Sequence, residues 1–204
     1  MKKILLFIGV CFVAISCTKE NFIDTGLANG DHDCSMLEYM RGDHYNWDST
    51  VVMIEHAGLT DLFEGKAPDY PKFTFFGVTS MSILRYMLDN EIDCIADMDP
   101  ETCKQMLLEY VYDEVILAEE VPEGTKSLVW PPITGEGGVE ITTVGGKTCR
   151  LFAETEDYEG VDDAGGTYIY LESNRTTHTV ASANIKFTNG IIHSLHYNHT
   201  FGKL

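Results

Sequence analysis

The stretch Asn189-Gly190-Ile191-Ile192-His193 connects two β-prone segments near the end of the chain. Asn-Gly is a strong turn signal, because both residues tolerate the positive φ angles that a tight hairpin requires. We therefore expect residues 182–195 to form two strands joined by a turn at Thr188-Asn189-Gly190.

Outward from this hairpin, the second half of the chain has the character of a β-sheet and the first half that of helices. Residues 147–153 alternate so that Cys149, Leu151 and Ala153 share one side, and residues 167–171 form another β-prone run. The first half predicts helices at 33–40 and 49–57, a short strand at 72–76, and two further helices after Thr79 and Asp99. Together these segments predict an α+β fold, with helices packed on a mainly antiparallel β-sheet.

Capping residues define two of the expected helices. Asp48 is placed to cap the helix at 49–57, with Trp47 and Val52 as a hydrophobic staple around the cap. Asp99, followed by Pro100 at the first helical position, is placed to cap the last helix. The expected apolar faces comprise Ile83, Leu84, Met87 and Leu88 in one helix and Cys103, Met106, Leu107, Tyr110 and Val111 in another.

Two segments resemble the two sequence motifs of the fasciclin-like domain family. Residues 74–79 (TFFGVT) are similar to the first motif, in which a strand buries its aromatics and a threonine caps the next helix. Residues 189–193 (NGIIH) closely match the second motif, and the order and spacing agree over residues 33–204. The residues that match are Thr74, Phe75, Phe76, Thr79, Asn189, Gly190, Ile192 and His193.

The resemblance implies a compact α+β wedge with roles in adhesion, or in contact with matrix and carbohydrate, and no known chemistry. It also implies that the second motif is mainly structural, with His193 anchoring its strand by hydrogen bonds. The sequence departs from the family pattern at Val78, where proline is usual, and at Tyr110, where the family has a histidine. Any role of that histidine is therefore in doubt for this chain.

The N-terminus is typical of a bacterial lipoprotein signal. Lys2 and Lys3 precede an apolar run, and Ala14-Ile15-Ser16-Cys17 resembles a lipobox, with small residues before the cysteine. We expect a signal peptide at residues 1–16, lipidation of Cys17, a flexible tether at 17–32 and the fasciclin-like domain at 33–204. Several acyl chains on Cys17 would anchor the protein firmly to a membrane.

The charge balance excludes one class of partner. The chain has 14 basic and 32 acidic residues, a formal net charge of −18, so it repels phosphate and we expect no nucleic-acid binding. The same charge disfavours direct docking on an anionic bilayer, so membrane contact is expected through the lipid anchor only.

No metal site or cofactor is expected. In a strand, residues 193 and 196 point to opposite faces, so His193, His196 and His199 are poorly placed to share one ion. The acidic stretch at 154–163 lacks the spacing of an EF-hand loop and is interpreted as a solvated loop. The four remaining cysteines, Cys34, Cys94, Cys103 and Cys149, can be disulfide-bonded or free.

No nucleophile elbow, phosphate-binding loop or zinc-protease motif is present, so the protein is not expected to be an enzyme. Some aromatics, among them Tyr45, Trp130, Tyr158, Tyr168 and Tyr170, suit contact with sugars or partner proteins. The leading hypothesis is a lipid-anchored cell-surface or outer-membrane protein that mediates adhesion through protein or glycan contact. The alternatives are an accessory lipoprotein of an outer-membrane glycan-uptake complex and, third, a glycan hydrolase with two facing carboxylates.

Overall fold

The computed structural model describes residues 30–127, 135–174 and 176–204. Its seven-stranded sheet has the order β2-β1-β7-β6-β5-β4-β3. Neighbouring strands are antiparallel except β1 and β7, which are parallel, so the sheet is mainly antiparallel as expected. The strands are β1 (Phe73–Gly77), β2 (Val111–Tyr112), β3 (Val139–Thr142), β4 (Thr148–Thr155), β5 (Thr167–Ser173), β6 (Thr176–Phe187) and β7 (Gly190–Leu195).

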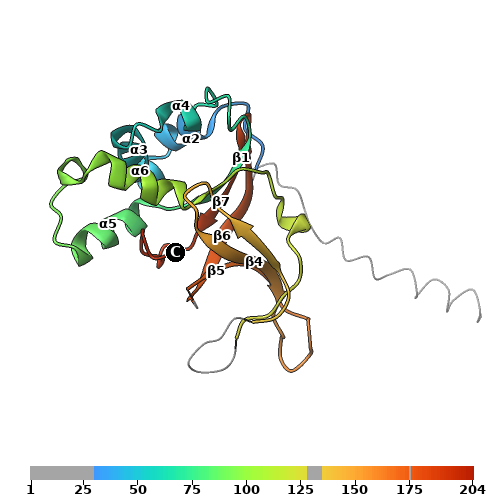
Figure 1. Ribbon diagram of the computed structural model, residues 1–204. Helices are drawn as coiled ribbons and strands as arrows, with labels where there is room; N and C mark the ends of the chain where they lie inside the picture. The colour runs from blue at the N-terminus through green and yellow to red at the C-terminus, as the bar shows by residue number, and fades with distance from the viewer. Residues whose placement is uncertain (1–29, 128–134, 175) are drawn as a thin grey trace, which may run out of the picture.

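The helices gather at the end of the molecule that holds β1 and β7, while β4, β5 and their connection extend away from them (Figure 1). This arrangement confirms the α+β class. The helices are α2 (Met36–Gly42), α3 (His44–His56), α4 (Thr60–Phe63), α5 (Ser80–Asp89) and α6 (Pro100–Leu108), with 3-10 turns η1 (Ile95–Asp97) and η2 (Ala118–Glu120). Within the described ranges, none of them is long and apolar enough to cross a membrane.

Strand β1 is the centre of the core. All five of its residues are buried, because β2 and β7 flank it in the sheet and the helices pack beside it. The Phe63 ring of α4 meets Phe73 and Phe75 edge to face, with centroids 5.5 and 4.9 Å apart. Edge-to-face pairs add roughly 0.5–1.5 kcal/mol beyond the area that they bury. The aromatic run in the first motif therefore forms the centre of the core.

The first two helices begin at other residues than expected. Helix α2 starts at Met36 rather than Asp33, because the Ser35 hydroxyl accepts the Glu38 N–H at 3.2 Å. Helix α3 starts at His44 and includes Asp48, because the Asp43 carboxylate caps it by accepting the Asn46 N–H at 3.3 Å. The prediction of an Asp48 cap was therefore wrong.

Helix α6 confirms its cap but ends earlier than the apolar spacing suggested. The Asp99 carboxylate accepts the Thr102 N–H at 2.8 Å, with Pro100 next to it in the first turn. The helix stops at Leu108, and Val111 belongs to β2, where it pairs with Phe75 of β1. Tyr110 and Val111 are buried in the core, but from a turn and a strand. Pairing with β1 thus ends a helical pattern that the sequence alone would continue.

Helix α5 also differs from its expected face. Ile83 is buried, whereas Leu84 is exposed and Leu88 is 69% exposed, so the four apolar residues do not all face the core. Thr79 occupies the cap position, but its side chain accepts no helix N–H and its Oγ1 lies 3.4 Å from Ser82 Oγ. The expected threonine cap is therefore one of position only.

The expected signal peptide, Cys17 and most of the tether lie outside the described residues. The last residues of the predicted tether are an exception, because Gly30 to His32 belong to the fold. The Lys186 N–H donates to the Gly30 carbonyl at 2.6 Å, and the His32 N–H donates to the Lys186 carbonyl at 2.9 Å. His32 also stacks on Phe187, with centroids 5.4 Å apart. The folded domain therefore includes Gly30, upstream of the expected boundary at residue 33.

Candidate functional site

Asn189 of the second motif holds two helices against the hairpin. Its side-chain oxygen accepts the Met36 N–H at 3.0 Å, at the start of α2. Its amide nitrogen donates to the Phe63 carbonyl at 3.0 Å, at the end of α4. The residue is buried, so each of these groups would otherwise lack a partner. Asn189 thus supplies bonds that the free ends of two helices require.

Gly190 follows at the start of β7, where the backbones of β1 and β7 approach each other closely. Its φ is 131°, and a Cβ there would lie 2.0 Å from the Phe73 carbonyl oxygen. Only glycine fits such an approach. The parallel pairing of β1 with β7, which runs from Phe73↔Gly190 to Gly77↔Ser194, therefore depends on this residue.

His193 is buried, and both its ring nitrogens are engaged by backbone groups. Nε2 donates to the Ile116 carbonyl at 2.8 Å, and Nδ1 accepts the Asn184 N–H at 3.3 Å. Burial lowers the pKa of His193, although the Ile116 bond and the Glu119 carboxylate partly offset this effect. The neutral ring therefore links β7 to β6 and to the segment before η2.

The remaining matched residues lie in the same region. The Thr74 hydroxyl donates to the Glu114 carbonyl at 2.7 Å and accepts the Ile116 N–H at 3.0 Å. Phe75, Phe76 and Ile192 are buried, and the Phe76 ring stacks near His193 at a centroid distance of 6.1 Å. The structure therefore brings all of the second motif and most of the first motif together around β1 and β7.

Asn184 is a site residue that the sequence reasoning missed. It has a positive φ of 55° and lies in an irregular part of β6, where the pairing with β7 shifts between Ser182 and Ile185. Its side chain accepts the Ala118 N–H at 2.8 Å and donates to Glu119 at 2.8 Å. Asparagine tolerates this conformation better than most residues, which is the one sequence signal it offered.

Strands β5 and β6 are paired over only part of their length, and they part next to a second shift in the β6–β7 pairing, between Val180 and Ser182. β5 pairs with β6 from Ser173↔Thr176 to Tyr170↔Thr179, and in the described ranges the pairing goes no further. Residues 167–169 then pair with β4 only, and β6 beyond Thr179 pairs with β7. We call the resulting gap, bounded by residues 167–169 and 180–183, the β5–β6 opening.

The opening is hollowed, with a volume of about 510 Å³. Its lining includes the consecutive residues Thr167, Tyr168 and Ile169 of β5 and the consecutive Val180 and Ala181 of β6. Successive side chains of a strand point to opposite faces, so consecutive residues line one hollow only along the edge of the strand. Ala118 and Glu119 of η2 close one side.

An acidic hollow adjoins the opening and shares Ala153 and Thr167 with it. The Lys126 ammonium lies there, 3.2 Å from Glu154 and 3.3 Å from Glu156, and donates to the Tyr170 hydroxyl at 2.9 Å. Burial alone would lower the pKa of Lys126, but the bonds to Tyr170 and Glu154 outweigh it and raise the pKa above its usual value. The carboxylates in the lining are Glu123, Glu136, Glu154, Glu156, Asp157 and Asp163.

A chain of buried polar side chains lies near the C-terminus. The Tyr110 hydroxyl is 2.8 Å from His199 Nε2, and His199 Nδ1 is 3.0 Å from His178 Nδ1. Burial lowers the pKa of His178 to about 4, an effect that the Lys203 backbone partly offsets. Burial and the neighbouring His178 lower the pKa of His199 to about 3. Both rings are therefore neutral near pH 7, and the Gly202 N–H completes the chain by donating to Tyr110 at 2.9 Å.

The other residues singled out from the sequence are dispersed. The four cysteines are all free thiols, which favours free cysteines over the alternative of disulfide bonds: Cys34, Cys94, Cys103 and Cys149. Across residues 30–127, 135–174 and 176–204, no cluster of three His, Cys, Asp or Glu side chains is placed to hold a metal ion. His193 and His199 are buried and lie in separate hydrogen-bond networks.

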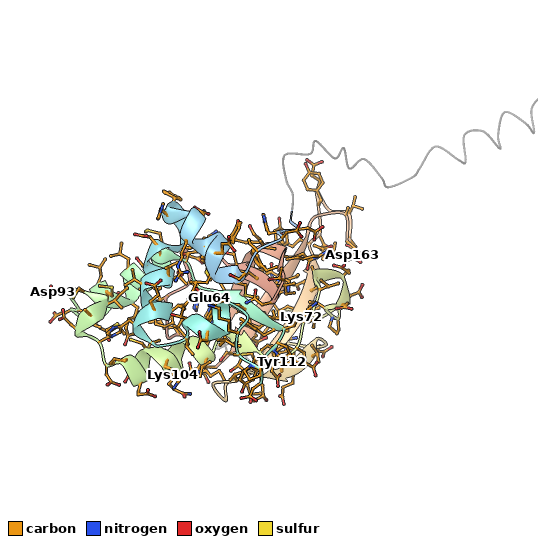
Figure 2. The ribbon with its side chains drawn as sticks, turned by 90° about the horizontal axis from the view of Figure 1, so that it is seen from above. Glu64, Lys72, Asp93, Lys104, Tyr112 and Asp163 are labelled. Atoms are coloured by element: carbon orange, nitrogen blue, oxygen red, sulfur yellow. The ribbon has the colours of Figure 1, made fainter. Side chains whose placement is uncertain are left out.

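The aromatics divide between core and surface. Trp47 and Tyr170 are buried, whereas Tyr158 is 60%, Tyr168 42% and Tyr45 90% exposed. Trp130 lies outside the described residues. Tyr168 lines the β5–β6 opening, and Tyr158 belongs to the β4–β5 connection near Asp163, at the end of the molecule opposite Asp93 (Figure 2). Of the exposed tyrosines, Tyr168 therefore lines the opening, and Tyr158 follows Asp157, which lines the acidic hollow.

No protein-family model and no curated protein matches the sequence. Among solved structures, the chain is similar to a FAS1 domain pair from the insect cell adhesion molecule fasciclin I, with a TM-score of 0.53 and 16% identity. The match covers 79% of this chain and 49% of that chain, so it spans about half the length of the domain pair. At this identity the likeness shows the fold, which is fasciclin-like.

Proposed function

We propose that this protein is a lipoprotein of the cell surface or outer membrane whose fasciclin-like domain mediates adhesion. It binds proteins or glycans and does not catalyse a reaction. The observation that carries the proposal is the likeness of its fold to domains of an insect cell adhesion molecule. The lipobox-like sequence that ends at Cys17 supports the lipid anchor.

The surface around the two hollows supports a binding role. Tyr168 lines the opening, and Tyr158 follows Asp157 of the acidic hollow in the chain. Both tyrosines are exposed, and exposed tyrosines are common anchors in protein and sugar contacts. The fold supplies the rigid support, since the Arg150 side chain joins the sheet to the segment beside the acidic hollow. It pairs with Glu172 and donates to the carbonyls of Glu136 and Thr125 at 2.9 and 3.0 Å.

Attachment of cells that express the full chain tests this proposal. Such cells are applied to immobilised matrix proteins and to a glycan array, beside cells that lack the protein. We expect selective attachment, and we expect the double variant Tyr158→Ala, Tyr168→Ala to reduce it about tenfold or more. Tyr45→Ala is the matched control, because this tyrosine is exposed on α3, at the helical end of the molecule.

Attachment that equals that of cells without the protein, on every surface, would contradict adhesion. Attachment to glycans alone, with none to matrix proteins, would identify glycans as the ligand, which both adhesion and the accessory role in glycan uptake predict.

A further inference from the structure

We propose that the β5–β6 opening binds an extended peptide, which adds as a strand to the edge of β6 and places basic side chains over the acidic hollow. The inference rests on the binding function proposed above and names the chemistry of the partner. Strand addition of this kind takes its affinity from main-chain hydrogen bonds and its specificity from the flanking pockets.

The free edge of β6 is the first observation. On the side away from β7, β5 pairs with β6 as far as Thr179, and the segment Gly30 to His32 pairs with it at Lys186. Between these two partners, no strand of the described chain pairs with residues 180–183 on that side. An unpaired edge presents backbone donors and acceptors that favour another strand.

The chain itself shows that this edge accepts an extended segment. Asp31 bridges Lys186 in parallel, and the two bonds at Lys186 use both its N–H and its carbonyl group. The gap at residues 180–183 therefore lies between two stretches of β6 that already carry partners on this side, and η2 bonds to Asn184 at its far end. Four residues at about 3.3 Å each leave room for about four peptide residues.

The side chains around the gap leave room for a backbone. Ala118, Ala181 and Ala183 line the hollow, and Ala181 and Ala183 are exposed on β6. Tyr168 stands at the rim on the β5 side. Small residues beside a strand edge allow the close approach that main-chain hydrogen bonds require.

Charge sets the sign of the partner. The adjoining hollow is lined by six carboxylates. Lys126 also lines it, but its ammonium group already pairs with Glu154 and Glu156. The net charge of −18 extends the same preference over the whole protein. A peptide that continues from the opening into the acidic hollow therefore binds best with lysine or arginine at that end.

A defined probe tests the proposal on the full chain. The probe is a short synthetic peptide of alternating valine and threonine that ends in two lysines, made with the lysines at either end because the strand direction is open. Binding is followed by NMR shifts and by hydrogen exchange of the amides of residues 167–169 and 180–183. We expect binding at those amides, weakened about tenfold or more when alternate peptide amides are N-methylated.

Two arginine variants locate the site. Ala183→Arg fills the edge of the opening, and we expect it to weaken peptide binding about tenfold or more. Ala96→Arg is the matched control on η1, which follows Asp93 at the opposite end of the molecule (Figure 2), and we expect it to leave binding unchanged. Thermal unfolding of both variants verifies that they are folded, and the N-methylated peptide tests the wild-type chain even if Ala183→Arg does not fold.

Equal binding of the N-methylated peptide would overturn strand addition, and unchanged binding by a folded Ala183→Arg variant would overturn the location. No binding of either probe up to about 1 mM would also overturn the proposal. If the protein fails these tests but still attaches cells, adhesion holds and strand addition is wrong. If it binds the peptide but attaches no cells, strand addition holds and the adhesion proposal is wrong.

Discussion

At the scale of single residues, Asn189 and His193 act by satisfying backbone groups that would otherwise be buried without partners. Asn189 serves the start of α2 and the end of α4, and His193 serves the β6 irregularity at Asn184. The second motif therefore has a structural role in this protein, and through Asn184 it also shapes the opening between β5 and β6.

Asn189→Ala tests the first of these roles. The change leaves the Met36 N–H and the Phe63 carbonyl buried without their partner, so we expect the free energy of unfolding to fall by about 2–4 kcal/mol. Urea denaturation measures the loss. Asn198→Ala is the control, because Asn198 is exposed, and it should change stability by less than about 0.5 kcal/mol. Equal effects of the two variants would contradict the role of Asn189.

The two buried histidines near the C-terminus predict a dependence of stability on pH. In the unfolded chain their pKa is the usual 6.5, whereas in the fold it is about 4 for His178 and about 3 for His199. The unfolded state therefore binds more protons below pH 6.5, so this stability is complete above that pH and is lost as the pH falls towards 4. From pH 7 to pH 5 we expect the pair to cost roughly 2–4 kcal/mol.

The measurement is the free energy of unfolding against pH for the wild type and for His178→Phe. The variant should show a shallower loss between pH 7 and pH 5, whatever its stability at pH 7. His44→Gln, at an exposed histidine of α3, should keep the wild-type slope. A wild-type slope in His178→Phe would show that His178 does not contribute to the acid sensitivity.

At the scale of elements, the parallel pairing of β1 with β7 joins the helices to the sheet, and Gly190 is its tightest point. A Cβ at Gly190 would meet the Phe73 carbonyl, so Gly190→Ala should lower the free energy of unfolding by about 3 kcal/mol or prevent folding. Gly146→Ala separates this clash from the cost of a positive φ. Gly146 has a φ of 80° with open space around it, so about 1 kcal/mol is expected there. Equal losses would show that the close approach of β1 does not matter.

Elements with a local signal were predictable from the sequence. The alternation in β4, the Asn-Gly turn before β7 and the Asp99-Pro100 start of α6 each depend on neighbours in the chain. The end of α6 was not predictable in this way, because Val111 leaves the helical pattern to pair with β1. Leu84 and Leu88 were likewise expected to face the core but are exposed, so helical spacing of apolar residues did not predict which of them are buried.

The candidate site was less predictable than the fold. The eight motif residues could be named from the sequence, but the opening arises where β6 leaves β5 for β7. That departure comes after Thr179, beside a shift in the β6–β7 pairing between Val180 and Ser182, and Asn184 holds η2 next to the opening. Lys126, Glu154 and Tyr170 are likewise brought together by sheet pairing across distant parts of the chain. Contacts of this range leave no mark at a fixed spacing in the sequence.

At the scale of the whole molecule, the helices gather at one end, and β4, β5 and their connection extend away from them (Figure 1). The two hollows are lined by β4, β5, β6 and the segments beside them, and the exposed Tyr168 belongs to this part of the chain. A fasciclin-like domain in a chain with a net charge of −18 is suited to contact partners in solution or on another surface rather than an anionic bilayer. Adhesion therefore requires that the domain lie outside the cell, with Cys17 as the proposed link to the membrane.

Protease treatment of intact cells tests this requirement most directly. Cells that express the full chain are treated with a protease that cannot cross the outer membrane, and the protein is followed by immunoblot beside a periplasmic control protein. We expect the domain to be degraded while the control protein stays intact, and Cys17→Ala to reduce the amount attached to the cell. Survival of the domain together with the control protein would place it in the periplasm and would contradict adhesion at the cell surface.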